Sequence, residues 1–140
     1  MEEKGITMRR MVLCMAIVVI SGAAMAQTDD TALRGAMKQV GPLVGGLGKK
    51  ISAKDSSAAG DAEKLQALFA EVRKFWEARS APDAAEFAAK AAAEFGEISK
   101  LVKASDWDGA AGGQKKAGAN CMGCHSAHRE KADDGGWKIK

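Results

Sequence analysis

Two cysteines and a histidine stand close together in the segment CMGCH, residues 121–125. On a helix, Cys121, Cys124 and His125 occupy positions i, i+3 and i+4, so their side chains share one face. The spacing C-x-x-C-H is typical of covalent haem attachment, in which two thiols bind the porphyrin and the imidazole binds the iron. We therefore predict one covalent haem c, held by Cys121 and Cys124, with His125 as the proximal iron ligand.

Two other uses of the same residues are open. A zinc site could combine Cys121, Cys124, His125 and His128, but four ligands packed so closely along one helix cannot surround an ion tetrahedrally. A thioredoxin-like C-x-x-C pair belongs in a βαβ context, and no segment has the alternating pattern of a strand. The sequence favours haem attachment over both alternatives.

The first residues have the pattern of a secretory signal. Arg9 and Arg10 precede the apolar run MVLCMAIVVISGAA, and AMAQ supplies a small-x-small cleavage site. We predict a signal peptide over residues 1–26, cleaved after Ala26, with translation starting at Met1 or Met8, and a periplasmic domain over residues 27–140. The apolar run is short for a membrane span, so none is expected after cleavage, and a retained anchor is the alternative.

The cysteine count and the charge narrow the class of protein. After cleavage, Cys121 and Cys124 are the cysteines that remain, so a disulfide framework with other cysteines is not expected. The net charge of the whole chain is +3, which is too mild to indicate nucleic acid binding. Paired carboxylates, a nucleophile with its base and a phosphate loop do not appear in the sequence. We therefore predict an electron carrier and not an enzyme.

Four helices are predicted for the domain. The first spans about 28–52, with Leu33, Met37 and Val40 in one apolar stripe, and a kink or break near Gly41 because Pro42 and several glycines weaken it. The others span about 60–79, 82–103 and 105–131, where apolar residues recur at spacings of three and four. The tail ADDGGWKIK is expected to be mobile.

Short loops between these helices predict an all-α fold, an antiparallel up-down-up-down four-helix bundle with the haem on its C-terminal helix. Aromatic residues are few, so the core is thin and would gain from a large apolar insert. Trp76 and Trp107 are expected in the core, whereas His128 is expected to be exposed. Basic residues along the last helix form either a docking patch for an acidic redox partner or a solvated face; these are Lys115, Lys116, Arg129 and Lys131.

The segment CMGCHSAHR resembles the pattern C-x-x-C-H-x-x-Tyr-Arg of class II c-type cytochromes, the cytochrome c′ family. The two cysteines, the first histidine and Arg129 match, and His128 stands in place of the aromatic residue. In the first predicted helix, LRGAMKQVG is similar to the family's Arg, then Met or Leu, then Lys-x-apolar-Gly, with one residue fewer between Arg34 and Met37. The resemblance implies an exported four-helix bundle with the haem motif on its last helix.

The same resemblance implies roles for the first-helix residues. Arg34 would contact a haem propionate, with a solvated charge as the alternative, and Met37 would be the sixth iron ligand, with core packing as the alternative. Met122 lies between the two haem cysteines, and His128 lies on the same helix as His125, so neither side chain can reach across the haem plane. Any Met or His sixth ligand is therefore expected to be Met37.

Members of the cytochrome c′ family are either low-spin with six iron ligands or high-spin with five, and the two types imply different functions. A low-spin haem ligated by His125 and Met37 would serve electron transfer with redox partner proteins. A five-coordinate, high-spin haem with a blocked distal side would bind small gases such as nitric oxide or carbon monoxide. We predict electron transfer, with gas binding as the alternative. Family members often pair through their first two helices, so a homodimer is also considered.

Overall fold

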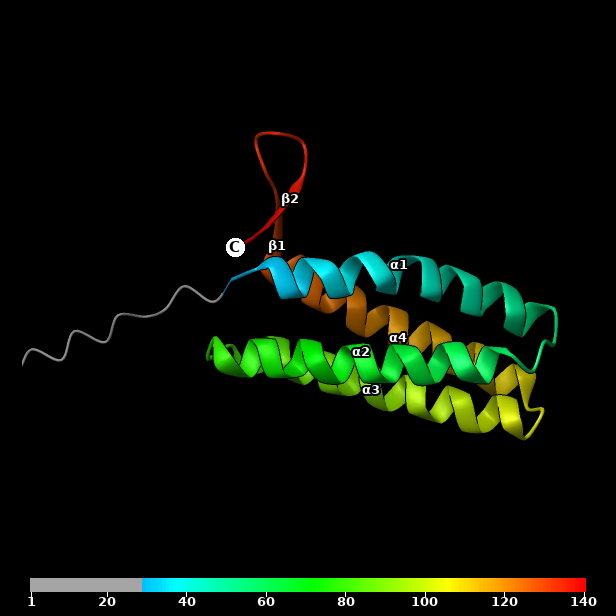
Figure 1. The fold of residues 1–140 in the computed structure, drawn as a ribbon. Coiled ribbons are helices and arrows are strands. Elements are labelled where there is room, and N and C mark those ends of the chain that lie inside the picture. The colour runs from blue at the N-terminus through cyan, green and yellow to red at the C-terminus, as the bar shows by residue number, and fades with distance from the viewer. Residues whose placement is uncertain (1–28) are drawn as a thin grey trace, which may run out of the picture.

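The computed structural model describes residues 29–140, and the predicted signal segment lies outside the described residues. Its elements, in chain order, are the helices α1 (Thr31–Ser52), α2 (Ala58–Ala78), α3 (Pro82–Lys103) and α4 (Trp107–His128) and the strands β1 (Arg129–Lys131) and β2 (Trp137–Ile139). Each helix runs opposite to the one before it (Figure 1). The all-α, up-down-up-down four-helix bundle predicted from the sequence is confirmed.

The apolar stripes of the four helices meet in one core. Phe95, Leu47, Leu65 and Ile98 are among its fully buried side chains, and the rings of Phe69 and Phe95 stack 5.5 Å apart. Helix α3 packs closely against both α2 and α4, whereas α1 meets α4 much less closely. The bundle is therefore tight along the two seams of α3, looser between α1 and α2, and loosest between its first and last helices.

Helix α1 runs without a break through Pro42, so of the kink or break predicted near Gly41, the break is wrong. Pro42 has no N–H for the carbonyl four residues before it, but its side chain is exposed, where water can meet that carbonyl. The apolar stripe continues past it, because Val40, Leu47 and Ile51 are all buried. Packing of this stripe against the bundle outweighs the low helix propensity of the glycines.

The helix boundaries differ from prediction mainly at the end of α4. Asp106 caps this helix, since its side chain accepts a hydrogen bond from the Gly109 N–H at 2.9 Å. The helix ends at His128, however, and not near Lys131. Over residues 29–140, no helix combines the length and the apolar character that crossing a bilayer requires.

The tail, which was expected to be mobile, forms a β-hairpin in the structure. Strands β1 and β2 pair in antiparallel register, with Arg129 opposite Ile139 and Lys131 opposite Trp137. Ile139 packs against the core, and the Lys140 N–H donates to the carbonyl of His128 at 3.2 Å. The hairpin rises beside the start of α1 and the end of α4 (Figure 1).

Gly113 explains how α4 approaches α3 so closely. A Cβ atom added at this position would lie 2.8 Å from Cγ1 of Ile98, a fully buried side chain, which is closer than real Cβ contacts allow. A Cβ added at the neighbouring Gly112 would meet no atom within 4 Å. Packing against α3 therefore requires a glycine at position 113, whereas position 112 has room for a side chain.

We expect Gly113→Ala to destabilise the bundle relative to Gly112→Ala by about 1–3 kcal/mol, because alanine at 113 overpacks the contact with Ile98. Both substitutions gain about 1 kcal/mol of helix propensity, so this gain cancels in the comparison. Urea unfolding of the two variants measures the difference. Equal free energies of unfolding would show that α3 and α4 do not meet at Gly113.

Candidate functional site

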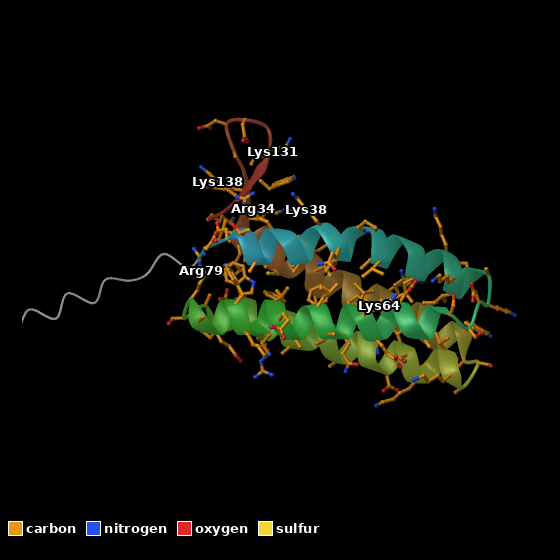
Figure 2. The ribbon with its side chains drawn as sticks, viewed as in Figure 1. Arg34, Lys38, Lys64, Arg79, Lys131 and Lys138 are labelled. Atoms are coloured by element: carbon orange, nitrogen blue, oxygen red, sulfur yellow. The ribbon has the colours of Figure 1, made fainter. Side chains whose placement is uncertain are left out.

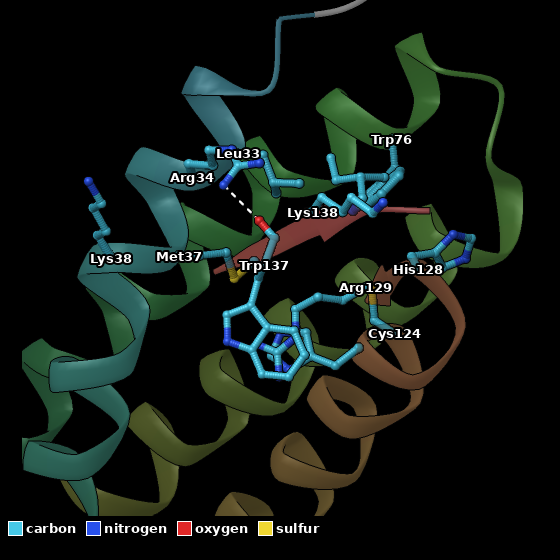
Figure 3. A pocket seen from close by; sticks show the side chains of 12 residues that line it. Leu33, Arg34, Met37, Lys38, Trp76, Cys124, His128, Arg129, Trp137 and Lys138 are labelled. Atoms are coloured by element: carbon cyan, nitrogen blue, oxygen red, sulfur yellow. Dashed lines mark hydrogen bonds between the residues drawn. The ribbon is translucent and has the colours of Figure 1, made fainter. Parts of the chain in front are cut away.

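A cavity of about 390 Å³ opens at the end of the bundle where α1 begins and α4 ends. This volume lies within the range of about 300–1,000 Å³ that is usual for small-molecule sites. Figure 3 shows its lining, which comes from α1, α2, α4 and the hairpin. The lining residues are Leu33, Arg34, Met37, Lys38, Trp76, Cys124, His125, His128, Arg129, Trp137, Lys138 and Ile139.

The motif residues lie along one half-buried face of α4, as their spacing predicts. Cys124 and His125 line the cavity, and Cys121 lies with both of them beside a smaller hollow of about 30 Å³. Phe87 of α3 also borders that hollow, and Gly123 lies against its ring, where an added Cβ would be 2.5 Å from Cε1. The glycine between the two cysteines thus lets α4 present the motif close to α3.

Met37 and Arg34 of α1 reach the same cavity as Cys124 and His125 of α4. Met37 borders both the cavity and the smaller hollow, so it adjoins the motif along its length. In Figure 3 its sulfur points from α1 toward the space that Cys124 faces from α4. All five residues predicted to hold or ligate a haem are therefore gathered around these two adjoining spaces.

Both thiols are free and are held in the protonated form. Burial raises the pKa of Cys121, and burial together with the charges of Cys121 and Asp83 raises the pKa of Cys124. Disulfide exchange needs a thiolate, and catalytic C-x-x-C pairs lower the pKa of the attacking cysteine to form it. The environment here has the opposite effect, which disfavours the thioredoxin-like alternative.

The imidazole of His125 is held in its neutral form. Burial, and then the positive charge of Arg129, lower the pKa of His125 below its ordinary value. A neutral imidazole keeps a ring-nitrogen lone pair for a metal ion, whereas a protonated one has none. The pKa shift therefore suits the predicted role of His125 as an iron ligand.

Four of the residues around the cavity are cations, namely Arg34, Lys38, Arg129 and Lys138, and none of the residues that line it is a carboxylate. Figure 2 shows Arg34, Lys38, Lys131 and Lys138 gathered where the hairpin adjoins α1. The cavity thus combines an apolar interior with a cationic border. Such a border favours a ligand that is largely apolar and carries negative groups at one edge.

The hairpin is tied to this site through Trp137. Arg34 Nη1 donates a hydrogen bond to the carbonyl oxygen of Trp137 at 2.8 Å, drawn as the dashed line in Figure 3. The guanidinium of Arg129 lies 4.0 Å from the centre of the Trp137 ring, within cation–π range. Strand β2 therefore forms one wall of the cavity, which the prediction of a mobile tail did not foresee.

His128 was predicted to be exposed, but only 17% of its side chain is accessible, so that prediction is wrong. Its Nε2 lies 2.7 Å from Asp83 Oδ2 of α3, and its ring centre lies 5.0 Å from that of Trp76. Trp76 is buried, which confirms the prediction that it belongs to the core, but it also lines the cavity. The spacing of His128 from Cys124 and His125, which puts all three on one helix face, could have indicated its contact with the site.

Within residues 29–140, no three His, Cys, Asp or Glu side chains converge as a set of metal ligands. Cys121, Cys124 and His125 lie along one face of α4. Comparison of the chain with family models, with curated proteins and with solved structures finds no match.

Proposed function

We propose that this chain is an exported c-type cytochrome with one covalent haem, which carries electrons between redox partner proteins. The observation that supports it most is that Cys124 and His125 of α4 and Met37 of α1 border one cavity from two different helices. His125 and Met37 would hold the iron of that haem, and such His/Met ligation raises a reduction potential. The signal segment predicted over residues 1–26 supplies the export.

Each cysteine of the motif has a defined chemical task in this proposal. Cys121 and Cys124 would hold the haem through thioether bonds, each made by addition of an S–H group across a vinyl C=C bond, with the sulfur on one carbon and the hydrogen on the other. No electrons are gained or lost in this addition, and it needs the free thiols that both residues carry. His125 then keeps its neutral ring for the iron.

The residues at the border of the cavity fit the charged edge of a haem. Propionates are carboxylates, and the cations Arg34, Lys38, Arg129 and Lys138 would stabilise them. Arg34 uses Nη1 on the Trp137 carbonyl, but a guanidinium has five N–H donors, so others remain for a propionate. When bound, the haem supplies an iron that changes its oxidation state by one electron.

A second candidate function is gas binding at a five-coordinate haem. Met37 packs against the apolar core as well as bordering the cavity, so it could cover the iron without ligating it. Such a site would be high-spin and would take carbon monoxide or nitric oxide. The two functions share Cys121, Cys124 and His125, and they differ in what Met37 does.

The experiment is to produce the full chain together with a c-type haem maturation system and to record absorption spectra, oxidised and reduced, with and without carbon monoxide. Haem staining of a denaturing gel shows whether the haem is covalent. We expect covalent haem and a low-spin spectrum that carbon monoxide does not change. A high-spin spectrum that shifts with the gas would favour the second function, and absence of covalent haem would overturn both.

A further inference from the structure

Trp137, on strand β2 of the hairpin, is 45% exposed although it also borders the cavity. A single exposed apolar side chain is normal on a folded protein and needs no explanation by itself. Tryptophan and arginine, however, are among the residues that most often carry the binding energy of a protein interface. The surroundings of Trp137 therefore decide whether its exposure has a use.

Three cations hold Trp137 in place. Arg34 Nη1 donates a hydrogen bond to its carbonyl oxygen at 2.8 Å, which ties the strand to α1. The guanidinium of Arg129 lies 4.0 Å from the centre of the indole ring, and Nζ of Lys131, its partner in the strand register, lies 5.9 Å from it. The ring is thus ordered before any partner arrives, so burying it in an interface costs little conformational entropy.

The cations around Trp137 are not neutralised by carboxylates of the described chain. Arg34, Lys38, Arg129 and Lys131 form no ion pair within residues 29–140. By contrast, every lysine of α3 pairs with a glutamate. Figure 2 shows that Arg34, Lys38 and Lys131 gather where the hairpin adjoins α1. We call these four cations, together with Trp137, the cationic hairpin surface.

A second exposed apolar side chain with cations nearby lies on α4. Met122 is 62% exposed, and Lys115 precedes it by seven residues, which puts the two on one helix face. Neither of these residues lines the cavity, whereas Trp137 does. A protein docked on the cationic hairpin surface would therefore touch a wall of the site itself, and electrons pass more readily over a shorter distance.

The charges of the hairpin turn favour a protein over a lipid surface as the partner. Asp133 and Asp134 are exposed in the turn between β1 and β2, which stands clear of the bundle in Figure 1. An anionic membrane is negatively charged over its whole surface and would repel these carboxylates. A protein can place its acidic residues opposite the cations and leave the turn uncovered.

We propose that the cationic hairpin surface is the docking site for an acidic redox protein, whose carboxylates face its cations around the Trp137 indole. The inference rests on the proposed function for the kind of partner. Of the basic residues that the sequence groups along the last helix, it assigns Arg129 and Lys131 to the interface and leaves Lys115 and Lys116 outside it. Opposite charges of this kind mainly raise the rate of association.

The first test measures electron transfer from an acidic protein to the haem-loaded chain. The donor is reduced flavodoxin, a small acidic protein whose flavin hydroquinone gives one electron to the ferric iron. Stopped-flow rate constants are compared in Lys131→Glu and Lys115→Glu, which each replace an exposed lysine and lower the net charge by the same amount. Both variants keep every residue that lines the cavity, so their absorption spectra should match that of the wild type.

At low ionic strength we expect Lys131→Glu to slow the second-order reaction about fivefold or more, and Lys115→Glu to slow it much less. The difference between the variants should vanish near 1 M salt, where the screening length is about 3 Å. Equal rate constants in the two variants at low ionic strength would overturn the inference, because their change in total charge is the same.

A second measurement maps the interface without electron transfer. A water-soluble carbodiimide joins lysine amines to the flavodoxin carboxylates that they touch, and mass spectrometry of the digested complex identifies the lysines. We expect links from Lys38 and Lys131. Links chiefly from Lys115 or Lys116 would overturn the inference.

Two further outcomes have distinct meanings. Sedimentation of the chain with phosphatidylglycerol vesicles that Lys131→Glu abolishes and Lys115→Glu does not would assign the surface to a membrane, and so would overturn the inference. Failure of the wild-type chain to bind haem covalently would overturn the proposed function, while the crosslinks would still show whether an acidic protein docks on the cationic hairpin surface.

Discussion

Replacing both Cys121 and Cys124 by alanine is expected to reduce covalently bound haem to background. These are the two free thiols of the described chain, and the thioether bonds need both sulfurs on the same helix face. Each single substitution leaves one sulfur, so one vinyl group stays unreacted and the absorption maximum of the reduced protein moves to longer wavelength. Haem staining of a denaturing gel and pyridine haemochrome spectra measure both effects.

A suitable control for the cysteines is Ser126→Ala. Ser126 lies one residue beyond the motif, is exposed, and bonds only to the Met122 carbonyl of its own helix. Its substitution raises helix propensity by a fraction of a kcal/mol and removes no group from the cavity. Covalent haem that persists in the double cysteine variant, at the level of Ser126→Ala, would show that the attachment site is elsewhere.

Met37→Leu is expected to convert a low-spin haem into a high-spin haem that binds carbon monoxide. Leucine keeps the volume and the apolar character of the side chain, so the cost in stability should stay below about 1.5 kcal/mol. What it removes is the thioether sulfur, and with it the sixth ligand. Loss of a Met ligand should also lower the reduction potential, because Met/His ligation raises it.

The matched control for Met37→Leu is Met122→Leu. Met122 is 62% exposed and lies between the two cysteines, outside the cavity. Its substitution is expected to leave the absorption spectrum and the potential as they are in the wild type. If Met37→Leu has the same low-spin spectrum as Met122→Leu, then Met37 packs in the core and another group ligates the iron.

The four helices could be predicted because their signals are local. Leu65, Phe69 and Val72 recur at spacings of three and four, and the structure buries all of them. The kink or break predicted near Gly41 depends on contacts that are not local, and a break there is wrong. Whether a proline is tolerated depends on which way it faces and on what the flanking residues bury, and both are set by the packing of α1 against the bundle.

The hairpin could not be predicted from local pattern. Strands of three residues are too short to show alternation, and their stabilising contact joins Arg34 to Trp137, which are 103 residues apart in sequence. The candidate site also has one part that local pattern predicts and one part that depends on distant contacts. The shared face of Cys121, Cys124 and His125 follows from helix geometry, whereas the burial of His128 depends on Asp83 of another helix.

The two principal walls of the cavity come from opposite ends of the described chain, since Leu33 to Lys38 face Cys124 to Ile139 across it. Closing a loop of this length has an entropic cost, which the few contacts between α1 and α4 must meet. A chain in which only α2 and α3 have paired therefore has no cavity to offer. A ligand that binds in this cavity therefore needs both ends of the described chain in place, and it would hold the first and last helices together.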